Sequence, residues 1–293
     1  MKPASFDYYA PRSLDEALRI LRDAGTDGRV LAGGQSLMPM LNCRLLNPGV
    51  LVDINRIEAL NRLDVAEDSL TIGALVRHAD LLHDNRLRDD WPLLFEATKQ
   101  VAHPAIRNRG TVCGSVVHND PAAEHPSVLA TLDGTVVIAG AAGRRELPAE
   151  RFFTGILSTA LQPGEMVVEL RYPRPPLGTG AAFVEFARRL GDFAIAGAAA
   201  MLTMRDGVCE RARLTIVGMG EGPLRARAAE DILTARRLGP RECEDAFAEA
   251  AATVSAAVEP AGDVHASSAY RRHLAGVMAK RALETALTRA AGH

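Results

Sequence analysis

The sequence predicts an α+β fold made of more than one unit. At 293 residues the chain is long for one compact domain, and its 47% hydrophobic share is ample for two or three cores. Residues 1–55 alternate helical and extended patterns, as a small α/β unit does. Beyond the Pro- and Gly-rich segment 173–178, strand patterns come first and helical patterns follow, which indicates a separate α+β domain with an antiparallel sheet.

The first unit begins with a capped helix. Ser13-Leu14-Asp15-Glu16 matches a capping box, in which the serine hydroxyl accepts a hydrogen bond from an early backbone N–H and Glu16 reaches back. Apolar residues then recur at helical spacing, and Gly25 ends the helix. The other elements predicted in this unit are a short buried strand at 30–31, a short helix over 36–42 and a strand over 51–54.

The middle of the chain mixes strands with amphipathic helices. Strand patterns cover 69–75, 135–139 and 166–172, and a helical pattern covers 91–101. Asp120-Pro121 is typical of a helix start, with aspartate at the N-cap and proline at the first helical position. We therefore expect a helix from there through Leu132.

The last part of the chain is built around a predicted hairpin. Asp206-Gly207 is a hairpin signal between strand patterns over 194–204 and 211–217. The other elements predicted here are a strand over 182–188 and helices over 226–233, 241–258 and 267–290. With segment 173–178 as the linker, the predicted division of the chain is 1–60, 61–177 and 178–293.

Two glycine-containing turns form the candidate ligand site. Ala32-Gly33-Gly34-Gln35-Ser36 follows a predicted strand, and Thr111-Val112-Cys113-Gly114-Ser115 precedes Asp120-Pro121. Glycine tolerates positive φ and has no Cβ, so consecutive backbone N–H groups can converge on an anion, and the serine hydroxyl can donate a further hydrogen bond. One such turn usually only reverses the chain. Two of them suggest a ligand whose phosphates are held from two sides, and the pyrophosphate of FAD fits that description.

Composition excludes several other classes of protein. A net charge of −2 gives no reason to expect nucleic acid or an anionic membrane as partner. Charged residues interrupt every apolar stretch before membrane-spanning length, and the N-terminus lacks a signal-peptide core, so we expect a cytoplasmic chain without a membrane span. The cysteines Cys43, Cys113, Cys209 and Cys243 are scattered, which suits a reducing compartment and argues against an iron–sulfur or zinc site in this chain.

With these segments in order, the chain resembles the FAD-binding medium subunit of the molybdenum hydroxylases. That family includes aerobic carbon monoxide dehydrogenase and the bacterial xanthine, nicotine and related dehydrogenases. The segments that carry the resemblance are Ala32–Ser36 with Leu37–Leu41, Leu51–Ile54, His103–Thr111, Asp120–Glu124, Gly191–Ala194 and Tyr270–Leu274. The resemblance implies two FAD-binding subdomains followed by a C-terminal α+β domain.

The resemblance also implies which residues bind FAD. The family's two glycine motifs hold the phosphates and the ribityl chain, and they map to Ala32, Gly33, Gly34, Gln35, Ser36 and Leu37 and to Thr111, Val112, Cys113, Gly114 and Ser115. The family aspartate that contacts the cofactor corresponds to Asp120, which on pattern alone would only be an N-cap. An aromatic residue near the flavin ring corresponds to Phe193, where many relatives carry tyrosine and where pattern alone favours a core residue.

Two positions depart from what is usual in the family. Cys113 stands where relatives usually have glycine, and we expect it to occupy an ordinary backbone position, with Gly114 as the indispensable glycine. Many relatives have glutamine at the position of Gln35, whereas the carbon monoxide enzymes resemble one another in having histidine there. Gln35 therefore argues against carbon monoxide as the substrate.

Other polar residues near the second motif have more than one interpretation. Arg107 and Arg109 either compensate cofactor phosphate or form a docking surface for a partner subunit. His103, His118 and His125 could form a relay, but scattered histidines are usually surface or hydrogen-bonded structural residues. We predict no catalytic residue in this chain.

The function implied by the resemblance is electron transfer through FAD. Substrate would be hydroxylated at a molybdenum cofactor on a large partner subunit, and electrons would pass through [2Fe-2S] clusters on a small partner to this FAD and then to an external acceptor. One alternative is a self-sufficient FAD-dependent oxidoreductase with its own substrate pocket. A nicotinamide-dependent Rossmann dehydrogenase is disfavoured because neither turn has Gly-x-Gly-x-x-Gly spacing, and a scaffold that has lost FAD is the non-enzymatic alternative.

Overall fold

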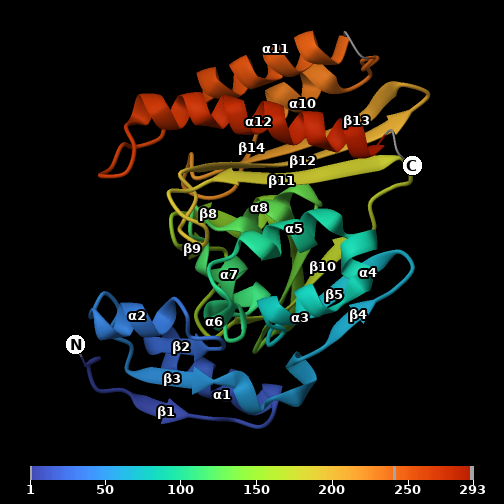
Figure 1. Cartoon of the computed structure of the whole chain (residues 1–293). Helices are drawn as coiled ribbons and strands as arrows, with labels where there is room; N and C mark the ends of the chain where they lie inside the picture. Colours follow the sequence, from blue (N-terminus) through green and yellow to red (C-terminus); the bar gives the residue numbers. More distant parts are fainter. Residues whose placement is uncertain (1, 240–241, 291–293) are drawn as a thin grey trace.

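The computed structural model describes residues 2–239 and 242–290 and confirms the α+β class. Figure 1 shows three larger sheets one above the other, with the N-terminal sheet at the bottom and the C-terminal sheet below two long helices at the top. Each sheet is formed by one continuous part of the chain. The predicted domain boundaries at residues 60 and 177 stay a prediction.

The N-terminal sheet is parallel, with strand order β1-β3-β2. Its strands are β1 (Asp7–Tyr9), β2 (Gly28–Leu31) and β3 (Val50–Asp53), and its helices are α1 (Leu14–Ala24) and α2 (Leu37–Asn42), with 3-10 turns at Gly25–Asp27, Ile54–Arg56 and Glu58–Leu60. Ser13 caps α1 as predicted, because its Oγ accepts a hydrogen bond from the Glu16 N–H at 3.2 Å. The Glu16 carboxylate accepts from Arg12 N–H at 3.0 Å, one residue before the position that a capping box uses.

The middle sheet is antiparallel, with strand order β4-β5-β10-β6-β7. Its strands are β4 (Leu63–Val65), β5 (Ser69–Gly73), β6 (Thr135–Gly140), β7 (Gly143–Pro148) and β10 (Met166–Pro173), and a small hairpin joins β8 (Phe153–Gly155) to β9 (Ser158–Thr159). The helices are α3 (His78–His83), α4 (Asn85–Asp90), α5 (Pro92–Gln100), α6 (Pro104–Arg107), α7 (Val112–His118), α8 (Glu124–Thr131) and α9 (Ala149–Phe152). Trp91, Phe152 and Tyr172 are among the largest fully buried side chains of this part.

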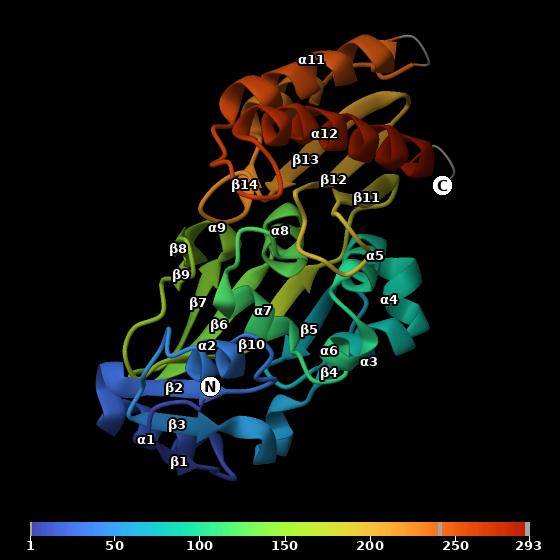
Figure 2. The same cartoon turned by 60° about the vertical axis from the view of Figure 1, so that its left-hand side comes forward.

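The C-terminal part is an antiparallel sheet covered on one face by helices (Figure 2). Its elements are β11 (Thr179–Phe186), β12 (Ala196–Arg205), β13 (Val208–Val217), β14 (Leu224–Arg225), α10 (Arg227–Leu233), α11 (Glu242–Ala257) and α12 (Ser268–Ala290). Asp206 and Gly207 join β12 to β13 with φ of 49° and 77°, as the hairpin signal predicts. The predicted start of the helix at Arg241 lies outside the described residues.

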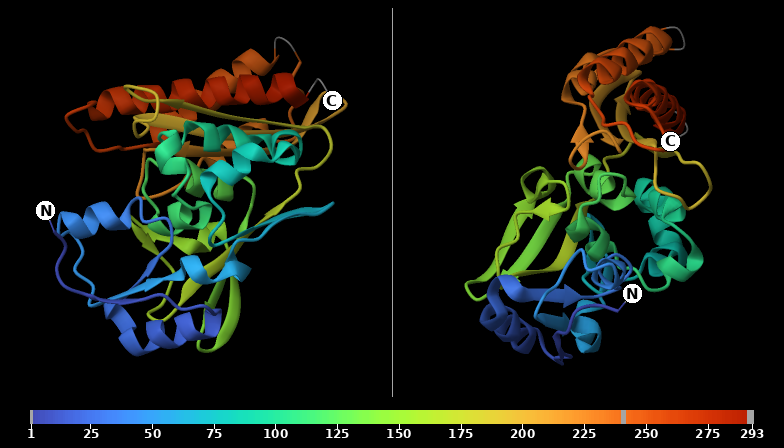
Figure 3. Two further views of the ribbon diagram at one scale, coloured as in Figure 1. Left: turned by 60° about the horizontal axis from the view of Figure 1, so that its bottom comes forward. Right: turned by 90° about the vertical axis from the view of Figure 1, so that its left-hand side faces the viewer.

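The two faces of this sheet belong to two different cores. Along β11, Ala182 belongs to a core that includes α12, whereas Phe183 belongs to the core of the middle part. Neighbouring strand residues point to opposite faces, so one face packs on helices of the C-terminal part and the other on α5 and α8. Figure 3 shows the sheet lying between these layers.

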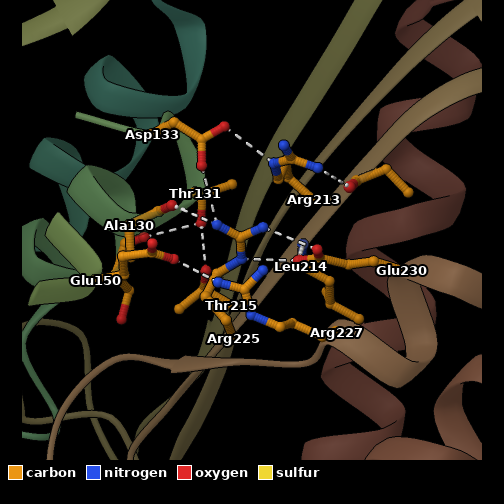
Figure 4. Close-up of polar contacts among 12 residues, drawn as sticks. Ala130, Thr131, Asp133, Glu150, Arg213, Leu214, Thr215, Arg225, Arg227 and Glu230 are labelled. Carbon is orange, nitrogen blue, oxygen red and sulfur yellow. Dashed lines mark hydrogen bonds and ion pairs between the residues drawn. The ribbon is translucent and has the colours of Figure 1, made fainter. Parts of the chain in front are cut away.

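An ion-pair network fastens the C-terminal sheet to the end of α8 (Figure 4). Arg225, whose side chain is 11% exposed, donates to the Ala130 carbonyl at 3.0 Å and to the Asp133 carboxylate at 3.1 Å. It also donates to both carboxylate oxygens of Glu230 at 2.7 and 2.8 Å. Arg213 donates to Asp133 at 3.0 Å, so a single carboxylate of the middle part receives hydrogen bonds from more than one arginine of the sheet. Nearby, Arg227 and Glu150 form an exposed ion pair.

Candidate functional site

The first glycine motif is a tight turn between β2 and α2. Gly34 has φ of 72°, in the left-handed region that favours glycine, as the sequence predicts. The Gln35 amide donates to the Gly33 carbonyl at 3.0 Å, which folds this side chain back on the turn. The Met38 N–H donates to the Gly34 carbonyl at 3.1 Å, so the turn leads directly into α2.

The second motif is the start of a helix, and its description as a glycine turn is wrong. Thr111 is the N-cap of α7, and its Oγ1 accepts a hydrogen bond from the Gly114 N–H at 3.0 Å. Cys113 lies buried in this helix with helical backbone, as expected of an ordinary position, and burial raises the pKa of its thiol. A Cβ on Gly114 would lie 2.6 Å from the Thr111 hydroxyl, so glycine is needed here for the cap and not for positive φ.

The fold brings the two predicted motifs together. A Cβ atom on Gly33 would lie 2.4 Å from the Arg109 carbonyl oxygen, 2.7 Å from the Gly110 Cα and 3.0 Å from the Thr111 nitrogen. Backbone of the first motif therefore lies directly on the segment that leads into the second. Only a residue without a side chain permits this contact.

Two polar residues that the sequence does not single out connect the two motifs through hydrogen bonds. The Asn55 amide donates to the Ala32 carbonyl at 2.9 Å, and its oxygen accepts from the Arg77 guanidinium at 2.5 Å. The same guanidinium donates to the Arg109 carbonyl. Asn55 and Arg77 stand outside both motifs in the sequence, so no local pattern could have identified them.

Asp120 does not cap a helix, contrary to the prediction. Its carboxylate accepts from the Ala122 N–H at 2.9 Å in a local turn, and α8 begins only at Glu124, with Ala123 as N-cap. The preceding residue, Asn119, ends α7 in the left-handed conformation at φ 48°. Its amide donates to the Gly155 and Ser158 carbonyls at 2.8 and 3.0 Å, which holds the β8–β9 hairpin beside Asp120.

Phe193 lies on the loop between β11 and β12 and is 73% exposed, so it is not a core residue. This loop touches the segment before the second motif, because a Cβ on Gly191 would lie 2.5 Å from the His103 ring and 2.9 Å from the Ala102 carbonyl. The buried Arg271 donates to the Ile195 carbonyl at 2.8 Å and fixes the end of the loop. Phe193 therefore lies in a loop that contacts Ala102 and His103, which precede the second motif in the chain.

The remaining candidates have structural roles or lie at the surface. Arg107 donates to the Val101 and Ala102 carbonyls at 2.8 and 3.0 Å, beside the end of α5, while Arg109 is exposed. His125 is buried and pairs with His78, with 3.0 Å between His78 Nδ1 and His125 Nε2. Among the described residues, no group of three or more His, Cys, Asp or Glu side chains could hold a metal ion. The described helices include none that is long and apolar enough to cross a membrane.

The residues present fit a cofactor that is gripped from two sides. Because Gly33 has no side chain and Gly34 has a positive φ, the backbone of the first motif lies next to the segment that leads into α7. A buried carboxylate oxygen, Oε2 of Glu185, lacks a hydrogen-bond partner within the described part of the chain. Buried polar atoms normally have partners, so this atom marks a place where a ligand group can supply one.

Comparison with known proteins shows the family to which the chain belongs. Residues 4–175 match the family described as FAD binding domain in molybdopterin dehydrogenase, and residues 181–286 match the CO dehydrogenase flavoprotein C-terminal domain. The chain is 43% identical to the 6-hydroxypseudooxynicotine dehydrogenase complex subunit alpha of Paenarthrobacter nicotinovorans, over 99% of this chain and 97% of that protein. It is 36% identical to the carbon monoxide dehydrogenase medium chain of Hydrogenophaga pseudoflava, over 99% and 100%.

Solved structures give the same result. Carbon monoxide dehydrogenase from Hydrogenophaga pseudoflava superposes with a TM-score of 0.94 at 37% identity, covering 99% of both chains. Quinoline 2-oxidoreductase from Pseudomonas putida 86 superposes with a TM-score of 0.91 at 38% identity, covering 100% and 99%. The predicted family is thereby confirmed: the chain belongs to the FAD-binding medium subunits of the molybdenum hydroxylases and is an oxidoreductase subunit.

Proposed function

We propose that this chain binds one FAD non-covalently and passes electrons from [2Fe-2S] clusters on a small partner subunit to an external acceptor. Substrate is hydroxylated at a molybdenum cofactor on a large partner subunit. The observation that carries the proposal is the contact of Gly33 with the Arg109–Thr111 backbone, which builds one cradle from two motifs. When bound, the isoalloxazine supplies the redox chemistry, and the chain positions it.

The proposed FAD contacts come from four segments. They are the turn residues Ala32, Gly33, Gly34, Gln35, Ser36 and Leu37; the helix start Thr111, Val112, Cys113, Gly114 and Ser115; Asp120; and Phe193. The turn and the helix start contribute backbone groups to the phosphates and ribityl chain. Phe193, exposed on its loop, is available to pack against the ring system.

Several observations support a heteromeric, cytoplasmic complex. Relatives that match nearly the whole chain are named as a complex subunit and as a medium chain. The described residues hold no three-residue metal cluster, which suits molybdenum and iron–sulfur centres on partner chains. The scattered positions of the cysteines in the sequence suit a reducing compartment.

Three measurements test the proposal, two on the endogenous protein and one on the isolated chain. Heat or acid should release FAD for chromatography, and native mass spectrometry should show a mass above that of this chain and its self-oligomers. Elemental analysis of the isolated chain should find no stoichiometric molybdenum, iron or zinc. Release of FMN, a covalent flavin, or a homo-oligomer that oxidises substrate alone would overturn the proposal, the last in favour of a self-sufficient oxidoreductase.

A further inference from the structure

A buried pair of histidines packs against the backbone at which the two motifs meet. Gly33 approaches Gly110 closely, since a Cβ on Gly33 would lie 2.7 Å from the Gly110 Cα. The ring of His78 covers the bare side of Gly110, because a Cβ there would lie 2.9 Å from His78 Cδ2 and 3.0 Å from His78 Nε2. The other ring nitrogen of His78, Nδ1, lies 3.0 Å from Nε2 of His125. Contacts therefore run from the first motif through Gly110 and His78 to α8.

Backbone pairing also ties His78 to the second motif. The His78 N–H donates to the Gly110 carbonyl at 3.1 Å, and the preceding residue, Arg77, forms an antiparallel bridge with Thr111. Thr111 is the buried N-cap of α7. The start of α3 is thus joined to the two residues that lead into α7, so a displacement of the His78 ring would also move the second motif.

The histidine pair has one favoured arrangement of hydrogens when both rings are neutral. A neutral imidazole carries one N–H and one bare nitrogen, and only one hydrogen fits between two nitrogens that are 3.0 Å apart. Nδ1 of His125 is buried and has no hydrogen-bond partner among the described residues, so a hydrogen on it would be an unpaired donor. Buried donors are rarely left unpaired. The shared hydrogen therefore belongs to Nε2 of His125, which donates to Nδ1 of His78.

An added proton disrupts this arrangement. The shared position is filled, and the outer nitrogen of His78, Nε2, already carries its hydrogen, so the nitrogen left to take the proton is Nδ1 of His125. The proton would create there a buried N–H without an acceptor and a positive charge away from water. Both costs are relieved when the rings separate and one of them reaches water. Proton uptake therefore favours an open pair and a displaced Gly110.

The charged groups around the pair oppose a positive charge on it. Burial, together with Arg107 and Arg77, lowers the pKa of His78 to about 4, and burial and then His78 lower the pKa of His125. The carboxylates on neighbouring elements already have partners: Asp80 accepts from the Arg77 N–H, Asp84 pairs with Arg86, Glu96 with Arg289, Asp133 with Arg213 and Arg225, and Glu150 with Arg227. Burial raises the pKa of Glu124 and Cys113 and lowers that of His118, so these three side chains are mostly uncharged at neutral pH.

We propose that His78 and His125 are positioning residues for FAD, because the closed, uncharged pair holds Gly110 and the second motif in the place that bound FAD requires. This inference rests on the proposed FAD site. Without FAD the pair opens more readily, so the pKa of its rings lies closer to the ordinary value of about 6.5. FAD binding closes the pair and releases a proton below that pH. Because the FAD-bound form holds fewer protons, FAD affinity falls as the pH falls from about 6.5 toward 4.

The test is FAD rebinding to the purified complex after removal of its flavin, followed by flavin fluorescence between pH 7.5 and pH 5. The wild-type Kd should rise about tenfold over this range. The double variant His78→Asn/His125→Gln places amide groups at the positions of Nδ1 and Nε2, so it keeps a hydrogen bond that takes up no proton. Its Kd should stay within about threefold of the wild type at pH 7.5 and change less than about twofold down to pH 5. His83→Gln, at an exposed position of the same helix, is the matched control and should follow the wild type.

A second measurement needs no variant. Calorimetry of FAD binding at pH 5.5 in two buffers of different ionisation enthalpy should show net proton release by the wild-type complex. Binding without proton release, or a double variant whose Kd depends on pH as that of the wild type does, would overturn the inference while leaving the FAD site intact. The calorimetry decides the question if the double variant fails to fold. Failure of the wild type to bind FAD at any pH would instead refute the proposed function.

Discussion

A Cβ atom on Gly33 would lie 2.4 Å from the carbonyl oxygen of Arg109, closer than real atoms of this kind approach. The contact joins the first glycine motif, which follows β2 of the N-terminal sheet, to the segment before α7 in the middle part of the chain. Asn55 and Arg77 bridge the same two segments through the Ala32 and Arg109 carbonyls. The spacing of the two motifs in the proposed FAD site therefore depends on the absence of a side chain at Gly33 and on the hydrogen bonds of Asn55 and Arg77.

Gly33→Ala should abolish or severely weaken FAD binding. The added methyl group meets backbone atoms, which cannot rotate away as a flexible side chain can, so the two motifs must separate. Loss of two charge-assisted hydrogen bonds at about 1.5–2 kcal/mol each would weaken FAD binding by two to three orders of magnitude. Titration of the flavin-free protein with FAD measures the effect.

Gly25→Ala is the control for this variant. Gly25 has φ of 56°, and a Cβ there meets nothing within 4 Å. Its ψ of −127° places it in a backbone region that side-chain-bearing residues rarely adopt, so the substitution should cost about 1–3 kcal/mol of stability and leave FAD affinity unchanged. If Gly33→Ala binds FAD as well as Gly25→Ala does, the close backbone contact at Gly33 is not part of the FAD site.

Thr111→Val should destabilise the protein by about 1–2 kcal/mol. The valine keeps the shape of threonine but removes the hydroxyl that caps the Gly114 N–H, and Thr111 is fully buried, so water cannot replace the bond. Thr111→Ser should retain most of the stability because its hydroxyl can still accept the bond. Urea unfolding monitored at equilibrium would show the difference, and equal midpoints for the two variants would contradict the cap.

The strands and long helices that the sequence predicts agree with the structure to within a few residues because their patterns are local, but the short or exposed strands β1, β4, β7, β8, β9 and β14 are not predicted. The two errors at the site also have local causes. Thr111 accepts a hydrogen bond from the Gly114 N–H, and this cap makes the second motif the start of a helix. Asn119 ends α7 in the left-handed conformation, so the next helix begins after Asp120. The role of Arg77 depends on its bonds to Asn55 and to the Arg109 carbonyl, both distant from it in the chain. Local patterns in a single sequence cannot predict contacts between residues that are distant in the chain.

The buried pair His78 and His125 should make the protein sensitive to acid. Burial, together with Arg107 and Arg77, lowers the pKa of His78 to about 4, and burial also lowers the pKa of His125. The unfolded chain therefore binds more protons below pH 6.5, and the stability from neutral His78 is lost as pH falls from there toward 4. The contribution of His78 alone amounts to about 2 kcal/mol between pH 7.5 and pH 5.

His78→Gln should flatten this dependence in urea unfolding measured at pH 7.5 and pH 5, even if the variant is less stable at both. His83→Gln is the matched control, since His83 is exposed on the same helix. A variant at position 78 with the full wild-type loss of stability on acidification would show that another group is responsible.

Asp133→Asn should loosen the junction between α8 and the C-terminal sheet. Asp133 accepts from Arg225 and Arg213, and its φ of 50° suits asparagine as well as aspartate, so the substitution removes charge without new strain. Because Arg225 is nearly buried, we expect a loss of about 1–3 kcal/mol in the free energy of unfolding and faster proteolysis of segment 173–178. Glu150→Gln breaks only the exposed pair with Arg227 and should cost less than about 0.5 kcal/mol. Equal losses would mean that the network contributes no more than a surface ion pair.

Phe193→Ala should weaken the binding of FAD without changing the stability of the chain. A side chain that is 73% exposed contributes little to folding, so the free energy of unfolding should stay within about 0.5 kcal/mol of the wild type. An aromatic contact with the flavin ring is worth about 1 kcal/mol, so the Kd for FAD should rise roughly fivefold. Leu190→Ala, in the same loop and 82% exposed, should change neither quantity. Unchanged affinity in Phe193→Ala would remove Phe193 from the site, and a large loss of stability would show that it packs in a core after all.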